Sequence, residues 1–168
     1  MRPKLLVAGI GNIFLGDDAF GSEAARHLLR REWPAGVRVE DFGIRGFDLT
    51  FALMDGYETI VMVDATPRGG APGTLYCIEA DLSQVQQAAV EPHGMDPMRV
   101  LATARSMGAR FEKAYIVGCE PDPESVDPDG PGWMGLSPAV EASLDEAVRM
   151  VEELVGRVLR GRPMEEGA

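Results

Sequence analysis

The sequence predicts an α/β fold, a three-layer sandwich in which a mostly parallel five-stranded sheet carries helices on both faces. Two observations predict it. Short segments rich in β-branched and large apolar residues are typical of buried strands, and between them apolar residues recur at helical spacing. Strands that alternate with helices favour a parallel sheet with right-handed crossovers. The 168 residues suit one globular domain, expected over 1–160, with a flexible tail at 161–168.

Five segments are expected to form the strands: 4–8, 37–42, 59–63, 74–78 and 113–118. The fourth segment follows the third across a turn rich in Pro and Gly. This turn is too short for a helical crossover, so the fourth strand is expected to run antiparallel to its neighbours.

The helices are expected from apolar periodicity. Phe20, Ala24 and Leu28 give the first helix an apolar face, and shorter helices are expected at 47–54 and 97–107. In the last helix, Ser137 is expected as N-cap and Pro138 at the first helical position. Its apolar positions follow helical spacing at Val140, Leu144, Val148, Val151, Leu154, Val155, Val158 and Leu159.

Composition excludes several classes of protein. Asp and Glu outnumber Lys and Arg by 27 to 16, and the resulting net charge of -11 would repel nucleic acid. The apolar run at the N-terminus stops at a glycine turn, too early for a secretory signal, and charges interrupt every later run before the ~20 residues of a membrane span. The expected compartment is therefore the cytoplasm. Cys77 and Cys119 form no CxxC pair, which argues against a disulfide framework or a structural zinc site.

The stretch GIGNIFLGDDAFG, residues 9–21, combines a glycine-rich loop with two acids. Its start matches the dinucleotide pattern G-x-G-x-x-G, but Phe14 occupies the third position, and carboxylates would oppose a pyrophosphate at a helix N-terminus. Either Asp17 or Asp18 could cap the first helix. The other acid then needs a different role.

A second acid site lies at the end of the third expected strand. Asp64 follows a continuous apolar run, where it could either cap a turn or face the crevice at which open α/β sheets bind ligands. If the first and third strands are adjacent, Asp18 and Asp64 stand above the same edge.

His93, in a loop before a helix, could join these acids as a metal ligand or act as a general base, whereas His27 is expected to be a surface or packing residue. Imidazole and carboxylate together suit a divalent transition metal. Cys119 also follows an expected strand and is a weaker candidate as a nucleophile, because no local cysteine-protease signature surrounds it.

The motifs GIGNIFLGDDAFG, DFGIRG, VDAT, EPHGMD, GCEPD and GLSPAV, in this order, resemble the hydrogenase maturation protease family over nearly the whole chain. The resemblance implies a twisted five-stranded α/β sandwich and an endopeptidase that removes the C-terminal extension of a [NiFe] hydrogenase large-subunit precursor. It also implies that Asp18, Asp64 and His93 recognise nickel already inserted in that precursor. No permanently bound metal is then expected. The alternatives are a non-enzymatic nickel carrier or assembly chaperone, and a nucleotide-binding module.

Some positions depart from the family pattern. Ala19 and Phe42 stand where many relatives have glycine, and Ile44 and Arg45 replace a small polar pair. Arg45 could contact the substrate or be an ordinary surface arginine. The segment 120–135, with its Trp133 and Met134, is expected to help hold the precursor. No sequence pattern specifies an oligomeric state.

Overall fold

The computed structural model describes residues 4–85, 96–130 and 133–161 of the chain. In this part, five strands form one sheet in the order β2-β1-β3-β5-β4. The strands are β1 (Leu5–Ile10), β2 (Val37–Gly43), β3 (Thr59–Ala65), β4 (Leu75–Glu79) and β5 (Lys113–Cys119). All neighbours pair in parallel except β4, which runs antiparallel to β5. The predicted sheet is confirmed, including the reversed fourth strand.

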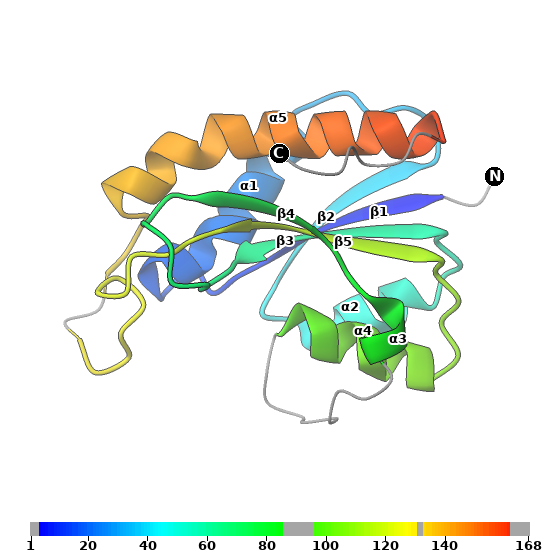
Figure 1. The fold of residues 1–168 in the computed structure, drawn as a ribbon, viewed down its shortest axis with the longest axis horizontal. Coiled ribbons are helices and arrows are strands. Elements are labelled where there is room, and N and C mark those ends of the chain that lie inside the picture. Colours follow the sequence, from blue (N-terminus) through cyan, green and yellow to red (C-terminus); the bar gives the residue numbers. More distant parts are fainter. Residues whose placement is uncertain (1–3, 86–95, 131–132, 162–168) are drawn as a thin grey trace.

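Helices cover both faces of the sheet (Figure 1). On one face lie α1 (Phe20–Leu29) and α5 (Pro138–Leu159), and on the other lie α2 (Gly46–Leu53), α3 (Leu82–Val85) and α4 (Pro97–Ser106). Successive side chains of β1 point to opposite faces of the sheet and so pack into both core layers. Leu5 and Val7 pack on the side of α1 and α5, and Leu6 and Ala8 pack on the side of α2 and α4. The interiors of the central strands β1 and β3 are apolar because both of their faces are buried, while Asp64 comes near the end of β3.

The helix starts differ from the prediction in their caps. Ser137 and Pro138 occupy the predicted N-cap and first position of α5, but the Ser137 hydroxyl donates to the carboxylate of Asp17 and caps nothing. Ala19 is the N-cap of α1, so the expected capping by Asp17 or Asp18 is wrong. Both acids lie instead in a 3-10 turn, η1 (Gly16–Ala19), which was not predicted and, like the four-residue α3, is too short to show a periodic pattern.

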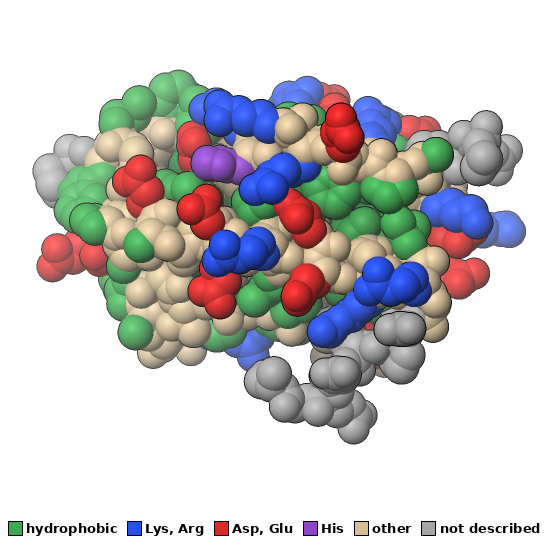
Figure 2. All heavy atoms as spheres, turned by 90° about the horizontal axis from the view of Figure 1, so that it is seen from above, with side chains coloured by type: hydrophobic (Ala, Val, Ile, Leu, Met, Phe, Trp, Pro, Cys, Tyr) green, Lys and Arg blue, Asp and Glu red, His purple; other side chains and the backbone are tan. Residues whose placement is uncertain are grey.

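The outward surface over α5 mixes positive and negative side chains (Figure 2), as expected for the solvent side of an amphipathic helix. No helix in the described ranges combines the length and apolar character needed to cross a bilayer. The expected tail at 161–168 lies outside the described residues from 162 onward.

Candidate active site

The order of the strands brings acids from distant segments to one edge of the sheet. β1 pairs in parallel with β3, with Gly9 opposite Val63. Asp18 follows β1 across the first loop, and Asp64 is the penultimate residue of β3. The carboxyl ends of the parallel strands lie at the left of Figure 1. In open α/β sheets, this edge is where ligands bind.

The glycines of the first loop allow close backbone packing. A Cβ atom on Gly21, in the first turn of α1, would lie 2.1 Å from the carbonyl oxygens of Ile10 and Val63. A Cβ atom on Gly9 would lie 2.4 Å from that of Ala25. These glycines therefore let α1 lie directly on β1 and β3, which explains the glycine pattern without a phosphate or a cation.

Asp17 is a structural acid. It is fully buried, and its carboxylate accepts hydrogen bonds from the Asp122 amide at 2.8 Å and from the Ser137 amide and hydroxyl at 2.7 Å each. Its own amide donates to the hydroxyl of Ser125 at 3.0 Å. Asp17 thus joins the first loop to the segment that leads into α5, and both of its carboxylate oxygens are used in these hydrogen bonds.

Asp18 is half-buried, and within the part of the chain that the structure describes its carboxylate has one hydrogen-bond partner. Its carboxylate accepts a hydrogen bond of 3.3 Å from the Asn12 amide. Burial raises the pKa of Asp18 above its usual value, and the Asn12 amide partly opposes this shift. Of the two adjacent acids, Asp18 is therefore the one whose carboxylate is free for another partner.

Asp64 is a buried acid among other acids. It is 9% exposed, and its pKa is raised well above the usual value, first by burial and then by the negative charge of Asp18. The backbone amide of Ala65 opposes the shift, and the charge of Asp96 adds to it. Such a strongly perturbed carboxyl group at a ligand-binding edge is typical of a functional site.

His93, the third predicted site residue, lies outside the described residues, so its predicted role stays a prediction. Within 4–85, 96–130 and 133–161, no group of three His, Cys, Asp or Glu side chains is arranged to hold a metal ion. The two acids alone carry the described part of the site.

The chain matches the family model of hydrogenase maturation proteases over residues 23–154, which is more than half of its length. Among curated relatives, it is 30% identical to the hydrogenase expression/formation protein HupD of Rhizobium leguminosarum bv. viciae, across 99% of this chain and 81% of that protein. It is 29% identical to the hydrogenase 2 maturation protease of Escherichia coli, with 88% of each chain covered. The chain belongs to the hydrogenase maturation protease family.

Solved structures of the family share the fold. The hydrogenase maturating endopeptidase HybD from E. coli superimposes with a TM-score of 0.73 at 29% identity, and 94% of each chain is covered. A hydrogenase 2 maturation peptidase from a Thaumarchaeota archaeon gives a TM-score of 0.67 at 31% identity, across 93% of this chain and 99% of that one. The chain is accordingly a hydrogenase maturation endopeptidase, and the predicted resemblance, fold and enzyme class are confirmed. The assignment favours an enzyme over a carrier or a nucleotide-binding module.

Cys119 does not fit the role of a nucleophile in this protease. It is fully buried on the α5 side of the sheet, with its Sγ 3.3 Å from the hydroxyl of Ser143. Burial raises the pKa of the Cys119 thiol, and the hydrogen bond with Ser143 partly opposes this shift. A nucleophilic cysteine needs an accessible thiolate, which burial disfavours. The candidate site consists of carboxylates at the sheet edge and does not include this thiol.

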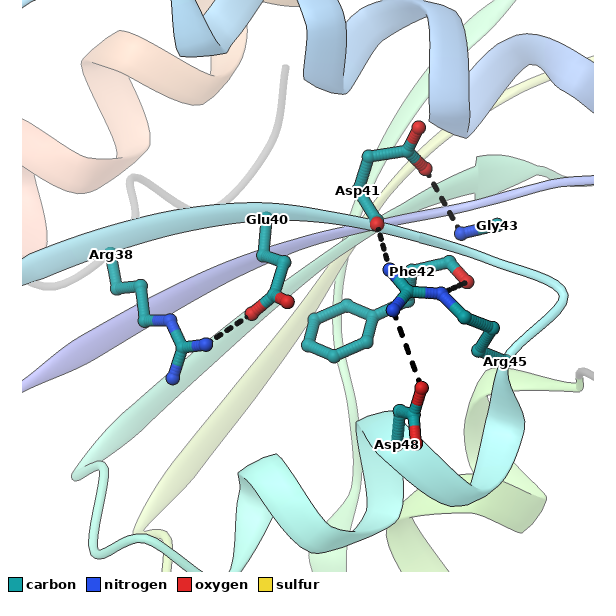
Figure 3. Close-up of polar contacts among 7 residues, drawn as sticks. All are labelled: Arg38, Glu40, Asp41, Phe42, Gly43, Arg45 and Asp48. Atoms are coloured by element: carbon teal, nitrogen blue, oxygen red, sulfur yellow. Dashed lines mark hydrogen bonds and ion pairs between the residues drawn. The ribbon is translucent and has the colours of Figure 1, made fainter.

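Three of the four positions expected to depart from the family pattern, Phe42, Ile44 and Arg45, lie at the end of β2 and in the loop before α2. Gly9 pairs with Asp41 and Ile10 with Gly43, so Phe42 is an extra residue in a bulge at the end of β2. The Arg45 guanidinium donates to the carbonyl oxygens of Asp41 at 2.6 Å and Phe42 at 3.2 Å (Figure 3). It also pairs with the carboxylate of Asp48 at 3.3 Å.

The Arg45 side chain is exposed at the surface but is bonded to its own loop, and its contact with the substrate stays a prediction. Its guanidinium is a clamp that holds its own loop. The Asp41 carboxylate adds to this by accepting a hydrogen bond of 2.9 Å from the Gly43 amide. The sequence motif DFGIRG showed where the loop lies, but the direction of the Arg45 side chain depends on how the loop folds back on β2.

Asp96 is a neighbour of the site that the sequence analysis missed. It is the N-cap of α4, where its carboxylate accepts a hydrogen bond of 2.9 Å from the Met98 amide. Its position before Pro97 is a normal helix-start signal that could have identified the cap. Its proximity to Asp64 follows only from the packing of α4 against the sheet.

Proposed function

We propose that this endopeptidase removes the C-terminal extension of a [NiFe] hydrogenase large-subunit precursor after nickel insertion. It acts in the cytoplasm and contacts the nickel of the precursor through Asp18, Asp64 and His93. The nickel arrives with the substrate, and the protein itself keeps no bound metal. The observation that carries this proposal is the pair of acids, one half-buried and one buried, at the carboxyl edge of the sheet.

The electrostatics of the two acids support a cation as the ligand. Burial and mutual repulsion disfavour two carboxylates in their ionised form. A divalent cation reverses this balance, because an opposite charge within a few Å favours the ionised form. The site is therefore unfavourable for two anions alone and favourable once a nickel-loaded substrate docks.

His93 completes the proposed set of ligands. Asp96, whose charge acts on Asp64, follows His93 by three residues, and three residues of chain span at most about 11 Å. One imidazole nitrogen and two carboxylate groups suit a divalent transition metal and leave positions open for substrate. A cation held in this way can act as a Lewis acid on the scissile carbonyl group or activate a water molecule.

The experiment is mass spectrometry of the large subunit coexpressed with and without this protein. Wild-type protein should shorten the nickel-loaded precursor by the mass of its C-terminal extension, and Asp18→Asn, Asp64→Asn and His93→Ala should leave it at full length. Circular dichroism of each variant checks that the fold is intact. Full processing by all three variants would remove the site assignment. A precursor left at full length by the wild-type protein would contradict the proposed substrate and would fit a nickel carrier instead.

A further inference from the structure

The outward face of α2 carries two large apolar side chains beside the exposed Asp48, and exposed phenylalanines are unusual on a helix at a protein surface. Its inner residues Leu49 and Leu53 are fully buried, as an amphipathic helix requires. On the opposite side, Phe47 and Phe51 are 75% and 57% exposed and lie one turn apart. A surface helix normally presents polar side chains there, as α5 does (Figure 2). The exposed phenylalanines of α2 therefore indicate a surface that binds another molecule.

Two further exposed apolar side chains lie close in sequence to α2 and to Asp18. Ile44, before α2, is 63% exposed, and Phe14, in the first loop, is 70% exposed. Both line a hollow of about 280 Å³, together with Asn12. The Asn12 amide donates to the carboxylate of Asp18, so this hollow adjoins the candidate active site. Phe14, Ile44, Phe47 and Phe51 are together called the α2 surface below.

The loop that carries the α2 surface is held in place. Arg45 donates to the carbonyl oxygens of Asp41 and Phe42 and pairs with Asp48 in the first turn of α2 (Figure 3). This clamp joins the end of β2 to the start of α2, on either side of Ile44 and Phe47. A surface that is already ordered loses less conformational entropy on binding than a mobile loop does.

We propose that the α2 surface docks the hydrogenase large-subunit precursor by receiving an apolar segment beside the bond to be cleaved. The inference rests on the proposed function and adds the region that grips the substrate. Its position favours this occupant, because a protease must hold a protein substrate against its active site and the α2 surface adjoins Asp18.

The size of the α2 surface argues against a second copy of this chain as its occupant. Its three phenylalanines expose on average about two-thirds of their surface. At ~150–250 Å² for each side chain, they offer on the order of 300–500 Å². A stable interface buries about 800 Å² per partner. The α2 surface is therefore too small for a stable dimer, but it suffices as the apolar centre of a transient complex whose remaining area comes from the active-site edge.

The test is a double variant, Phe47→Ser with Phe51→Ser, compared with Leu29→Ser, an exposed leucine on α1 outside the α2 surface. Processing of a nickel-loaded precursor is followed over a range of precursor concentrations. The double variant should raise KM by about 10- to 100-fold with kcat within about 2-fold of wild type, because these residues contact substrate away from the chemistry. The control should match wild type in both constants, and thermal unfolding should be the same for all three proteins.

Sedimentation velocity of each protein, alone and with precursor, separates docking from cleavage. Wild-type protein that binds the precursor without shortening it would contradict the proposed function, and weaker binding by the double variant would still support the docking surface. An unchanged KM and unchanged binding of the double variant would overturn the docking proposal. So would a dimer of the wild-type protein that the double variant dissolves, since the occupant would then be a second copy.

Discussion

The same substitution should have different effects at the adjacent acids: Asp17→Asn should lower the stability of the fold, and Asp18→Asn should abolish processing. Asp17→Asn replaces one carboxylate oxygen with an amide group. Among the described residues, that carboxylate is approached by three donors at 2.7–2.8 Å. The two backbone amides, from Asp122 and Ser137, bind different oxygens. In either orientation of the new side-chain amide, its NH2 group faces one of these two backbone N–H groups, which then has no acceptor.

The magnitude follows from these contacts. A hydrogen bond to a charged acceptor contributes about 1.5–3 kcal/mol, and an unsatisfied buried donor costs about 1–3 kcal/mol. Removing the desolvated charge of Asp17 offsets part of this, so we expect a loss of about 3 kcal/mol in the free energy of unfolding. At ~2–4 °C per kcal/mol for a chain of this size, Tm should fall by about 6–12 °C.

Asp18→Asn is the matched control. Asp18 accepts a longer hydrogen bond of 3.3 Å from Asn12, and burial already disfavours its charge. Its free energy of unfolding should change by less than about 1 kcal/mol, while processing of the precursor is lost. Urea unfolding followed by circular dichroism measures the stability of both variants. Equal stability of Asp17→Asn and wild type, within about 0.5 kcal/mol, would refute the structural role of Asp17.

Four further variants test stability and activity. Asp64→Asn should stabilise the free enzyme above about pH 4 while abolishing processing. The pKa of Asp64 is higher in the folded state than in the unfolded state, so the folded state binds this proton more tightly. As pH rises between these two pKa values, the free energy of unfolding of the wild type therefore falls by about 1.4 kcal/mol for each unit by which they differ. Gly21→Ala should cost at least about 3 kcal/mol, because its Cβ would meet two backbone carbonyl oxygens at 2.1 Å. Gly156→Ala, in α5 beside a flexible arginine side chain, should instead stabilise by about 0.5–1 kcal/mol. Cys119→Ala should leave kcat unchanged, because the thiol is buried and lies against Ser143 of α5.

Each of these has a direct measurement. Unfolding of Asp64→Asn and wild type in urea between pH 4 and pH 8 should give a difference that grows with pH, and a constant difference would contradict the raised pKa. Thermal unfolding ranks the two glycine variants, and equal effects would contradict the close packing of α1 on the sheet. Loss of processing in Cys119→Ala, with its fold intact, would restore the thiol as a candidate nucleophile.

Much of the fold was predictable because burial leaves a periodic trace in the sequence. The continuous apolar run of β3 and the helical spacing of α5 predicted elements that the structure has at nearly the same bounds. The short turn before β4 predicted its reversed direction, since a parallel neighbour needs a longer crossover. Very short elements such as η1 and α3 contain too few residues for a period to appear.

The site was predictable in outline only. An acid in the loop after the first strand and an acid at the end of the third strand indicated the carboxyl edge of the sheet, and the structure brings Asp18 and Asp64 near that edge. The sequence could not show that Asp17 supports the fold while the carboxylate of Asp18 faces the candidate site, because the partners of Asp17 lie 105 and 120 residues away in the chain. The clamp made by Arg45 could not be inferred either, because two of its three acceptors are backbone carbonyl groups, which every residue possesses.

By itself, the sequence determined the alternation of strands and helices, the apolar faces that form the two core layers and the family. These properties follow from spacing and residue type, which the chain carries along its length. The tertiary structure decided which acid supports the fold, which acids share the edge, and that α2 presents phenylalanines outward. These properties depend on contacts between segments far apart in the chain, and such contacts exist only once the order of the strands has brought those segments together.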